Sequence, residues 1–132
     1  MKTIGLPQMV EELNLKNLTP DIDMYGAKIT VSEINRPALQ LTGYFEHFAN
    51  ERVQIIGYVE YTYLEHLERQ EKIRAYENFI SKKIPCVIFT SLTKPDEDLL
   101  DLARKYQVPT FTTDRMTSAF MAEIIRWLNV KL

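Results

Sequence analysis

The side chains that most often carry catalysis or bind metals are few in this chain of 132 residues. Its one cysteine, Cys86, lies in the apolar run PCVIFT at residues 85–90, whereas a reactive thiol needs exposure and nearby positive charge. Its two histidines, His47 and His66, show no metal-site spacing, because neighbours such as Glu65 and His66 point in different directions on a helix. We therefore expect no catalytic residue and no metal ligand in this chain.

Loops that hold phosphate groups require closely spaced glycines, because backbone N–H groups must approach the anion. The chain has four glycines, Gly5, Gly26, Gly43 and Gly57, and no two of them lie within ten positions of each other. The ATP-binding P-loop and the dinucleotide-binding fingerprint are therefore both absent. We expect no cofactor in this chain.

Polar residues follow two expected strands and are candidates for ligand binding. Ser91 follows the run at residues 85–90, and Asp114 follows the expected strand at residues 109–112. Open parallel sheets bind ligands at the carboxyl ends of their strands, so these residues could line a pocket for a small polar ligand. Hydroxyl groups also form turns and cap helices, so a purely structural role is the alternative.

Arg36 is the third candidate, in the stretch INRPALQLTGYF at residues 34–45. It precedes Pro37, which suits the first position of a short helix, so we expect Arg36 at the helix cap, where a side-chain acceptor is the usual residue. Arginine cannot accept a hydrogen bond. Either a nearby acid such as Glu33 offsets it at the surface, or its guanidinium reaches a carboxylate or phosphate of another domain, subunit or ligand.

Tyr44 is the fourth candidate, as part of the aromatic segment YFEHF at residues 44–48. This segment holds three aromatic residues and a histidine within five positions. Aromatic residues and arginine are enriched at protein interfaces. We expect part of this segment in the core and part at an interface.

Helices and strands that position these residues follow from the apolar pattern. The expected helices are residues 6–13, 37–42, 58–83, 95–106 and 117–128, and the expected strands are residues 27–31, 53–56, 85–90 and 109–112. The helical segment 58–83 is expected as two helices or with a kink at the charged run ERQEKIR. Thr117 or Ser118 is expected to cap the last helix. Strands and helices alternate after residue 50. This order favours one three-layer α/β domain, with a mostly parallel sheet and helices on both faces.

Composition narrows the class of protein. Hydrophobic residues make up 45% and charged residues 26%, as in an ordinary globular domain. Sixteen basic and eighteen acidic residues are interspersed, with no basic run, so a nucleic-acid partner is not expected. No apolar stretch approaches the ~20 residues of a membrane span. A single cysteine fits a reducing compartment, and we expect a cytoplasmic protein.

The chain resembles the amino-terminal domain of the bacterial HPr kinase/phosphorylase family. INRPALQLTGYF and the later ERVQIIG, residues 51–57, resemble that family's patterns I-x-R-P-G-L-x-L-x-G-Y-F and D-R-[IV]-Q-[LIV]-[LIV]-G, with Ala38 where the family usually has glycine. The resemblance continues in order through further positions: Glu60, Tyr63, Leu64, residues 85–90, Leu99, Leu100, Ala103, Thr117 and Ser118. It therefore covers nearly the whole chain as one domain, residues 1–132.

This resemblance implies a function for a longer parent protein. Family members phosphorylate a serine of HPr, a carrier of the sugar phosphotransferase system, with ATP or pyrophosphate and magnesium; they also remove that phosphate and govern carbon catabolite repression. They form hexamers, and their P-loop kinase domain is expected after residue 132. Their amino-terminal domains share a three-layer fold with the first domain of a peptidoglycan-precursor ligase. The alternative is a stand-alone module that binds a nucleotide or sugar phosphate.

Overall fold

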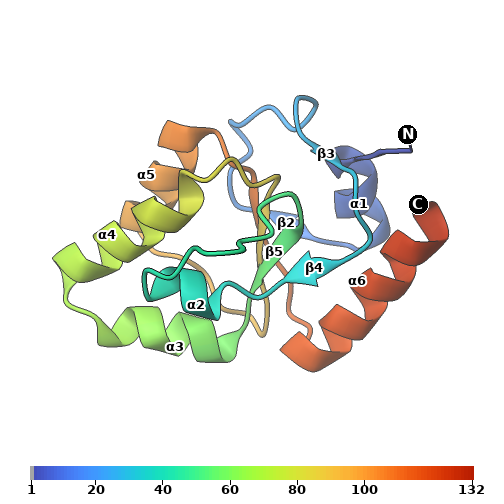
Figure 1. Ribbon diagram of the computed structural model, residues 1–132. Helices are drawn as coiled ribbons and strands as arrows, with labels where there is room; N and C mark the ends of the chain where they lie inside the picture. Colours follow the sequence, from blue (N-terminus) through green and yellow to red (C-terminus); the bar gives the residue numbers. More distant parts are fainter. Residues whose placement is uncertain (1) are drawn as a thin grey trace.

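The computed structural model describes residues 2–132 and contains a five-stranded sheet in the order β2-β7-β6-β5-β4 (Figure 1). The strands of this sheet are β2 (Lys16–Asn17), β4 (Ile34–Asn35), β5 (Val53–Ile56), β6 (Val87–Phe89) and β7 (Thr110–Thr112). β4 to β7 are mutually parallel, and β2 pairs antiparallel with β7. A separate antiparallel pair joins β1 (Ile4–Gly5) to β3 (Lys28–Ile29).

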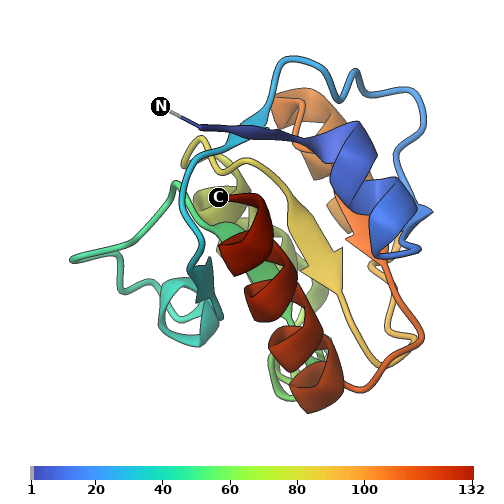
Figure 2. The same ribbon diagram turned by 90° about the vertical axis from the view of Figure 1, so that its right-hand side faces the viewer.

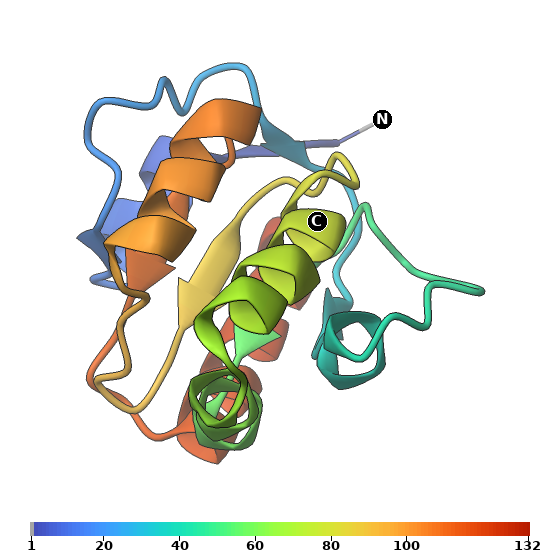
Figure 3. The same ribbon diagram turned by 90° about the vertical axis from the view of Figure 1, so that its left-hand side faces the viewer.

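Six helices surround the five-stranded sheet within the described residues. They are α1 (Leu6–Glu12), α2 (Ala38–Leu41), α3 (Tyr58–His66), α4 (Arg69–Ile80), α5 (Glu97–Tyr106) and α6 (Thr117–Lys131). α1 and α6 lie in front of one face of the sheet in Figure 2, and α4 and α5 lie in front of the opposite face in Figure 3. The expected three-layer α/β fold with helices on both faces is confirmed.

The central strands are apolar on both sides because each face of the sheet is covered by helices. Ile55, Ile88 and Phe111 are opposite one another on adjacent strands and belong to the core that includes α1 and α6. Their neighbours Ile56 and Phe89 belong to the second core, with α3, α4 and α5. All five are fully buried. This alternation explains why the run at residues 85–90 is continuously apolar.

The segment at residues 58–83 forms two helices, as expected, and the break at residues 67–68 includes only the first residue of the charged run, Glu68, which caps α4. The rest of the run, residues 69–74, was expected to interrupt the helix but forms the start of α4. Lys72 explains this difference, because it faces α5 and forms an ion pair with Asp96 at the start of that helix. Arg69 likewise pairs with Asp98 at 2.8 Å. The charged side chains of the run therefore link α4 to the start of α5.

Two expected helix starts are shifted. α5 begins at Glu97 with Asp96 as its cap, whose carboxylate accepts from the N–H of Leu99 at 3.1 Å, so Pro95 precedes the cap. α6 is capped by Met116, not by Thr117 or Ser118.

Among residues 2–132, none of the helices has the length and apolar character needed to cross a membrane.

Candidate functional site

Three parallel strands end at one edge of the sheet, and the segments that follow them form a cavity. β5 leads through Gly57 into α3, β6 leads to Ser91, and β7 leads to the start of α6. The cavity has a volume of about 530 Å³. It is lined by Arg36, Tyr58, Val59, Ser91, Met116, Thr117 and Ser118. The carboxyl edge of the sheet, where open α/β folds bind ligands, is therefore hollowed in this protein.

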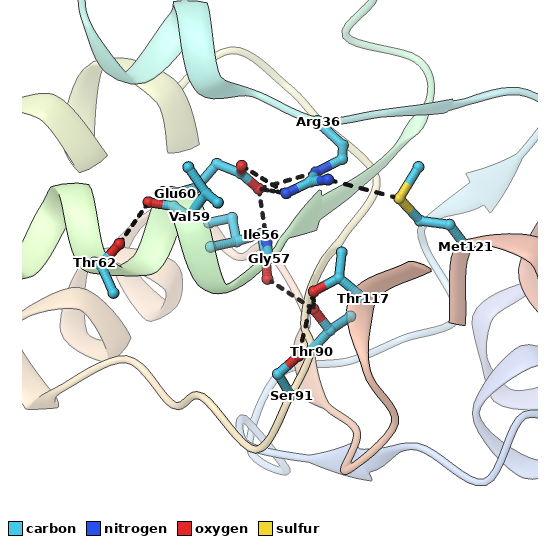
Figure 4. Close-up of polar contacts among 10 residues, drawn as sticks. All are labelled: Arg36, Ile56, Gly57, Val59, Glu60, Thr62, Thr90, Ser91, Thr117 and Met121. Carbon is cyan, nitrogen blue, oxygen red and sulfur yellow. Dashed lines mark hydrogen bonds and ion pairs between the residues drawn. The ribbon is translucent and has the colours of Figure 1, made fainter. Parts of the chain in front are cut away.

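Arg36 forms a bidentate ion pair with Glu60 at one wall of the cavity (Figure 4). Its Nε donates to Oε1 at 3.1 Å, and its Nη2 donates to Oε1 at 2.8 Å and to Oε2 at 2.7 Å. The Glu60 side chain is 4% exposed and the Arg36 side chain is 34% exposed. The planar guanidinium matches a carboxylate in this geometry, which fixes both side chains.

Glu60 also holds the start of α3. It is the third residue of this helix, and its Oε1 accepts the N–H of Gly57 at 2.7 Å. A carboxylate that reaches back in this way satisfies a donor that the helix cannot, and it complements the positive end of the helix dipole. One buried carboxylate therefore connects the chain after β4, through Arg36, to the start of α3.

Gly57 lies where a larger residue does not fit. A Cβ at this position would meet Arg36 Nη2 at 2.6 Å and Thr117 Cγ2 at 2.8 Å. Its backbone angles, φ −89° and ψ −175°, are open to any residue, so space and not conformation requires the glycine. The guanidinium of Arg36 and the start of α6 thus pack directly against the backbone that follows β5.

Thr117 connects α6 to the end of β6. Its Oγ1 lies 2.7 Å from Thr90 Oγ1 and 3.3 Å from Ser91 Oγ. Thr117 is the first residue of α6 and follows the cap, so its hydroxyl bonds to the end of β6 and not to its own helix. Arg36 also contacts α6, with Nη1 3.9 Å from Met121 Sδ. Figure 4 shows that these polar groups point toward one another across the strand ends.

A second polar network lies beside the first, between β4 and β5. Asn35 Nδ2 donates to Gln54 Oε1 at 2.7 Å, and Gln54 is fully buried. Gln54 Nε2 in turn donates to the carbonyls of Arg52 at 2.9 Å and Ala49 at 3.2 Å. A buried amide needs such partners, and here they attach the loop at residues 42–52 to the sheet.

The structure brings two of the four candidate residues together. Arg36 and Ser91 line the same cavity. Asp114 lies in a neighbouring hollow of about 280 Å³, together with Lys16 and Lys94. Tyr44 is half exposed on the loop at residues 42–52, which projects from the body in Figures 2 and 3. Among the residues that the structure describes, Tyr44 is not one of those that line the cavity.

The structure also identifies the acid that offsets Arg36. It is Glu60, whereas Glu33 pairs with Arg52 at 2.9 Å. The cap of α2 is Pro37, so Arg36 lies one residue before the cap and its side chain is free to reach α3. Sequence reasoning named Glu60, Gly57 and Thr117 as positions of the family resemblance but did not predict that they contact Arg36 or one another's segments at this site. The sequence did contain a signal for Glu60. It lies three residues after Gly57, the cap of α3, and a glutamate at this position is typical of a capping box.

Two features typical of a magnesium or ATP site are absent from the part of the chain that the structure describes. Within residues 2–132, no three His, Cys, Asp or Glu side chains are grouped to hold a metal ion. The widely spaced glycines provide no phosphate loop. Burial raises the pKa of the Cys86 thiol, which keeps it neutral and poorly nucleophilic at neutral pH.

Comparison with known proteins finds relatives described as HPr kinase/phosphorylases. HPr kinase/phosphorylase of Lachnoclostridium phytofermentans is 45% identical over 132 residues, which are 100% of this chain and 43% of the relative. The corresponding protein of Caldicellulosiruptor bescii is 40% identical over 98% of this chain and 41% of its own length. The chain thus spans less than half the length of these relatives.

A solved structure shares the fold. The CBS and DRTGG domains of the regulatory region of Clostridium perfringens pyrophosphatase, solved with the activator diadenosine tetraphosphate, match with a TM-score of 0.60 and 16% identity. The match covers 92% of this chain and 45% of that one. The family model described as HPr Serine kinase N terminus matches residues 4–128. The chain therefore belongs to this family and is the amino-terminal domain of an HPr kinase/phosphorylase.

Proposed function

We propose that this chain is a non-catalytic domain with an assembly or regulatory role in a bifunctional HPr serine kinase/phosphorylase. The whole protein would phosphorylate HPr of the sugar phosphotransferase system with ATP or pyrophosphate and magnesium, and would thereby control carbon catabolite repression. Its catalytic residues would lie outside this chain. The identity to HPr kinase/phosphorylases over the full length of the chain supports this proposal.

One observation carries the non-catalytic assignment. At the carboxyl edge of the sheet, the groups that could act as a base or a nucleophile form hydrogen bonds with their neighbours. The Glu60 carboxylate accepts from Arg36 and from the Gly57 N–H, and the Thr117 hydroxyl is hydrogen-bonded to that of Thr90. These groups connect β4, β5, β6, α3 and α6. A nucleophile or general base must instead keep a free position for its substrate. The cluster suits a scaffold that fixes the shape of a surface.

The proposed partners follow from the same assignment. They are a carboxy-terminal kinase domain of the same chain, HPr through that domain, and further copies of the protein in a hexamer. A cytoplasmic location fits the use of ATP. Interspersed charges and a net charge of −2 give no basic surface for nucleic acid, and we propose neither a nucleic-acid nor a membrane partner.

A second role is favoured by one feature, the cavity of about 530 Å³ at the carboxyl edge. Its volume lies within the range of small-molecule sites, about 300–1,000 Å³. In this alternative the chain is a small-ligand module that binds a nucleotide or a sugar phosphate. A ligand there would contact α3 and α6 together, and it would act on the kinase through their relative position.

Phosphate transfer tests the non-catalytic assignment. This chain is incubated with HPr, radiolabelled ATP and magnesium, and the full-length relative from Lachnoclostridium phytofermentans serves as the positive control. We expect label on HPr with the relative and none with this chain. Folding of the chain is checked by circular dichroism in the same buffer. Transfer by the folded chain above a no-enzyme blank would refute the assignment.

A further inference from the structure

Three large apolar side chains that line the cavity are exposed, and we call them the apolar shelf. They are Tyr58, Val59 and Met116, and their exposed fractions are 61%, 68% and 67%. Tyr58 and Val59 begin α3 after β5, and Met116 precedes α6 after β7, so two separate segments present apolar groups at one edge. Scattered apolar residues are normal at a surface, whereas a cluster beside a cavity is typical of a binding site.

The backbone is unusual at Ser91, which lines the cavity, and at Leu92, which lines the neighbouring hollow. Ser91 and Leu92 are both left-handed, with φ of 58° and 61°, which is unusual for two successive residues other than glycine. The Ser91 N–H donates to the Arg115 carbonyl at 2.8 Å, and the Leu92 N–H donates to the Thr113 carbonyl at 3.1 Å. Such strain persists where the surrounding structure enforces it, and it is most common at functional sites.

The polar lining of the cavity offers hydrogen-bond donors to an anion. It contains the guanidinium of Arg36 and four hydroxyl-bearing residues, Tyr58, Ser91, Thr117 and Ser118, but no acidic side chain. Glu60 is 4% exposed and is covered by the guanidinium that it binds. Arg36 Nη1 is 3.9 Å from a thioether sulfur, a weak acceptor, so this nitrogen retains donor capacity for an anionic oxygen.

From these features we propose that the cavity binds a nucleoside monophosphate, an inference that rests on the small-ligand role proposed above. The base lies on the apolar shelf against Tyr58 and Met116, and the phosphate lies toward Arg36 and the hydroxyl groups. Stacking on an aromatic side chain suits any base. A sugar phosphate has the charge but no flat apolar group, so it leaves the shelf uncovered.

Titration calorimetry with matched probes tests the proposal. The probes are the four common nucleoside monophosphates, together with adenosine and ribose 5-phosphate, which are the two parts of AMP. We expect at least one nucleotide to bind this chain and to raise its melting temperature. Ribose 5-phosphate is expected to bind about tenfold more weakly or worse, because one lost stacking contact has an effect of that order.

Two variants locate the site. Tyr58→Ala is expected to weaken nucleotide binding about tenfold while ribose 5-phosphate is unaffected. Tyr25→Ala is the matched control, since Tyr25 is 73% exposed and lies outside the cavity lining. Ser118→Asp places a negative charge at the cavity wall, where it repels phosphate yet suits the start of α6, and it is expected to weaken both nucleotide and ribose 5-phosphate.

The outcomes separate this inference from the proposals on which it rests. Equal binding of AMP and ribose 5-phosphate would overturn the base site and leave a small-ligand module. No binding by any probe would overturn the ligand site and leave the non-catalytic assignment, which depends on the transfer assay. A dimer that Tyr58→Ala dissociates would show that a second copy covers the shelf, which also overturns the inference.

Discussion

Replacing Arg36 by alanine tests how the domain depends on its carboxyl-edge cluster. The variant leaves the Glu60 carboxylate, 4% exposed, with the Gly57 N–H as its remaining partner. Removing one member of a buried ion pair costs about 3–5 kcal/mol. Arg36 itself is 34% exposed, so water compensates in part, and we expect a loss of about 2–3 kcal/mol. The melting temperature should fall by roughly 10 °C.

Arg52→Ala is the matched control for this experiment. Arg52 is 32% exposed and pairs with Glu33, whose side chain is 68% exposed. Exposed ion pairs contribute up to about 1 kcal/mol, so the control should lose less than half as much stability as Arg36→Ala. The free energy of unfolding is measured by urea titration with circular dichroism, which reports on the whole domain.

A double-mutant cycle isolates the pair. Glu60→Gln keeps an oxygen for the Gly57 N–H but removes the buried charge. We expect the double variant to be at least about 1 kcal/mol more stable than the sum of the two single losses predicts. Equal losses for Arg36→Ala and Arg52→Ala, or additivity in the cycle, would refute the reasoning that burial of Glu60 makes this pair important.

Three other perturbations test separate parts of the account. Gly57→Ala should lower the melting temperature by several degrees, since its Cβ would lie 2.6 Å from Arg36 Nη2; an unchanged value would contradict the packing argument. Tyr76→Phe should leave the free energy of unfolding in urea titrations unchanged or raised, because the buried Tyr76 hydroxyl has no hydrogen-bond partner among the described residues. The nearby Thr110 hydroxyl donates to the Val108 carbonyl instead. A clear loss of stability would contradict this reasoning. The hydrogen bond from Trp127 lowers the pKa of Glu12 below its usual 4.5, so this stabilisation is present above that value and is lost as pH falls through the lowered pKa. In Glu12→Gln, the free energy of unfolding should therefore fall less steeply as the pH drops below about 5. Unfolding is followed by the fluorescence of Trp127, and an unchanged slope in this pH range would argue against the hydrogen bond.

The larger elements of the fold could be predicted from the sequence because their signals are local. The apolar run around β6 and the helical stripe of α5 each extend over several residues, so periodicity identifies them. β1, β2, β3 and β4 have two residues each, and their pairing depends on neighbours distant in sequence. No pattern of two residues separates a strand from a loop, which is why β3 was expected to be longer and the other three were not expected.

The candidate site was predicted only in part. Arg36 stood out because arginine is an unusual residue at an expected helix start, but its partner lies 24 residues further along the chain. Contacts of that length depend on the crossover between β4 and α3, which one sequence does not specify. The shift of the α2 cap to Pro37 has the same origin, since the reach of Arg36 toward Glu60 is a tertiary contact.

The most direct test of the central claim uses the relative from Lachnoclostridium phytofermentans, with and without the stretch that aligns with this chain. Kinase activity, phosphorylase activity and the number of subunits in the assembly are measured for both forms. We predict that the shortened protein still transfers phosphate to HPr, and that its number of subunits or its ratio of the two activities changes. Complete loss of transfer by a folded shortened protein, or no change in either the number of subunits or the ratio of the two activities, would contradict a non-catalytic domain that acts in assembly or regulation.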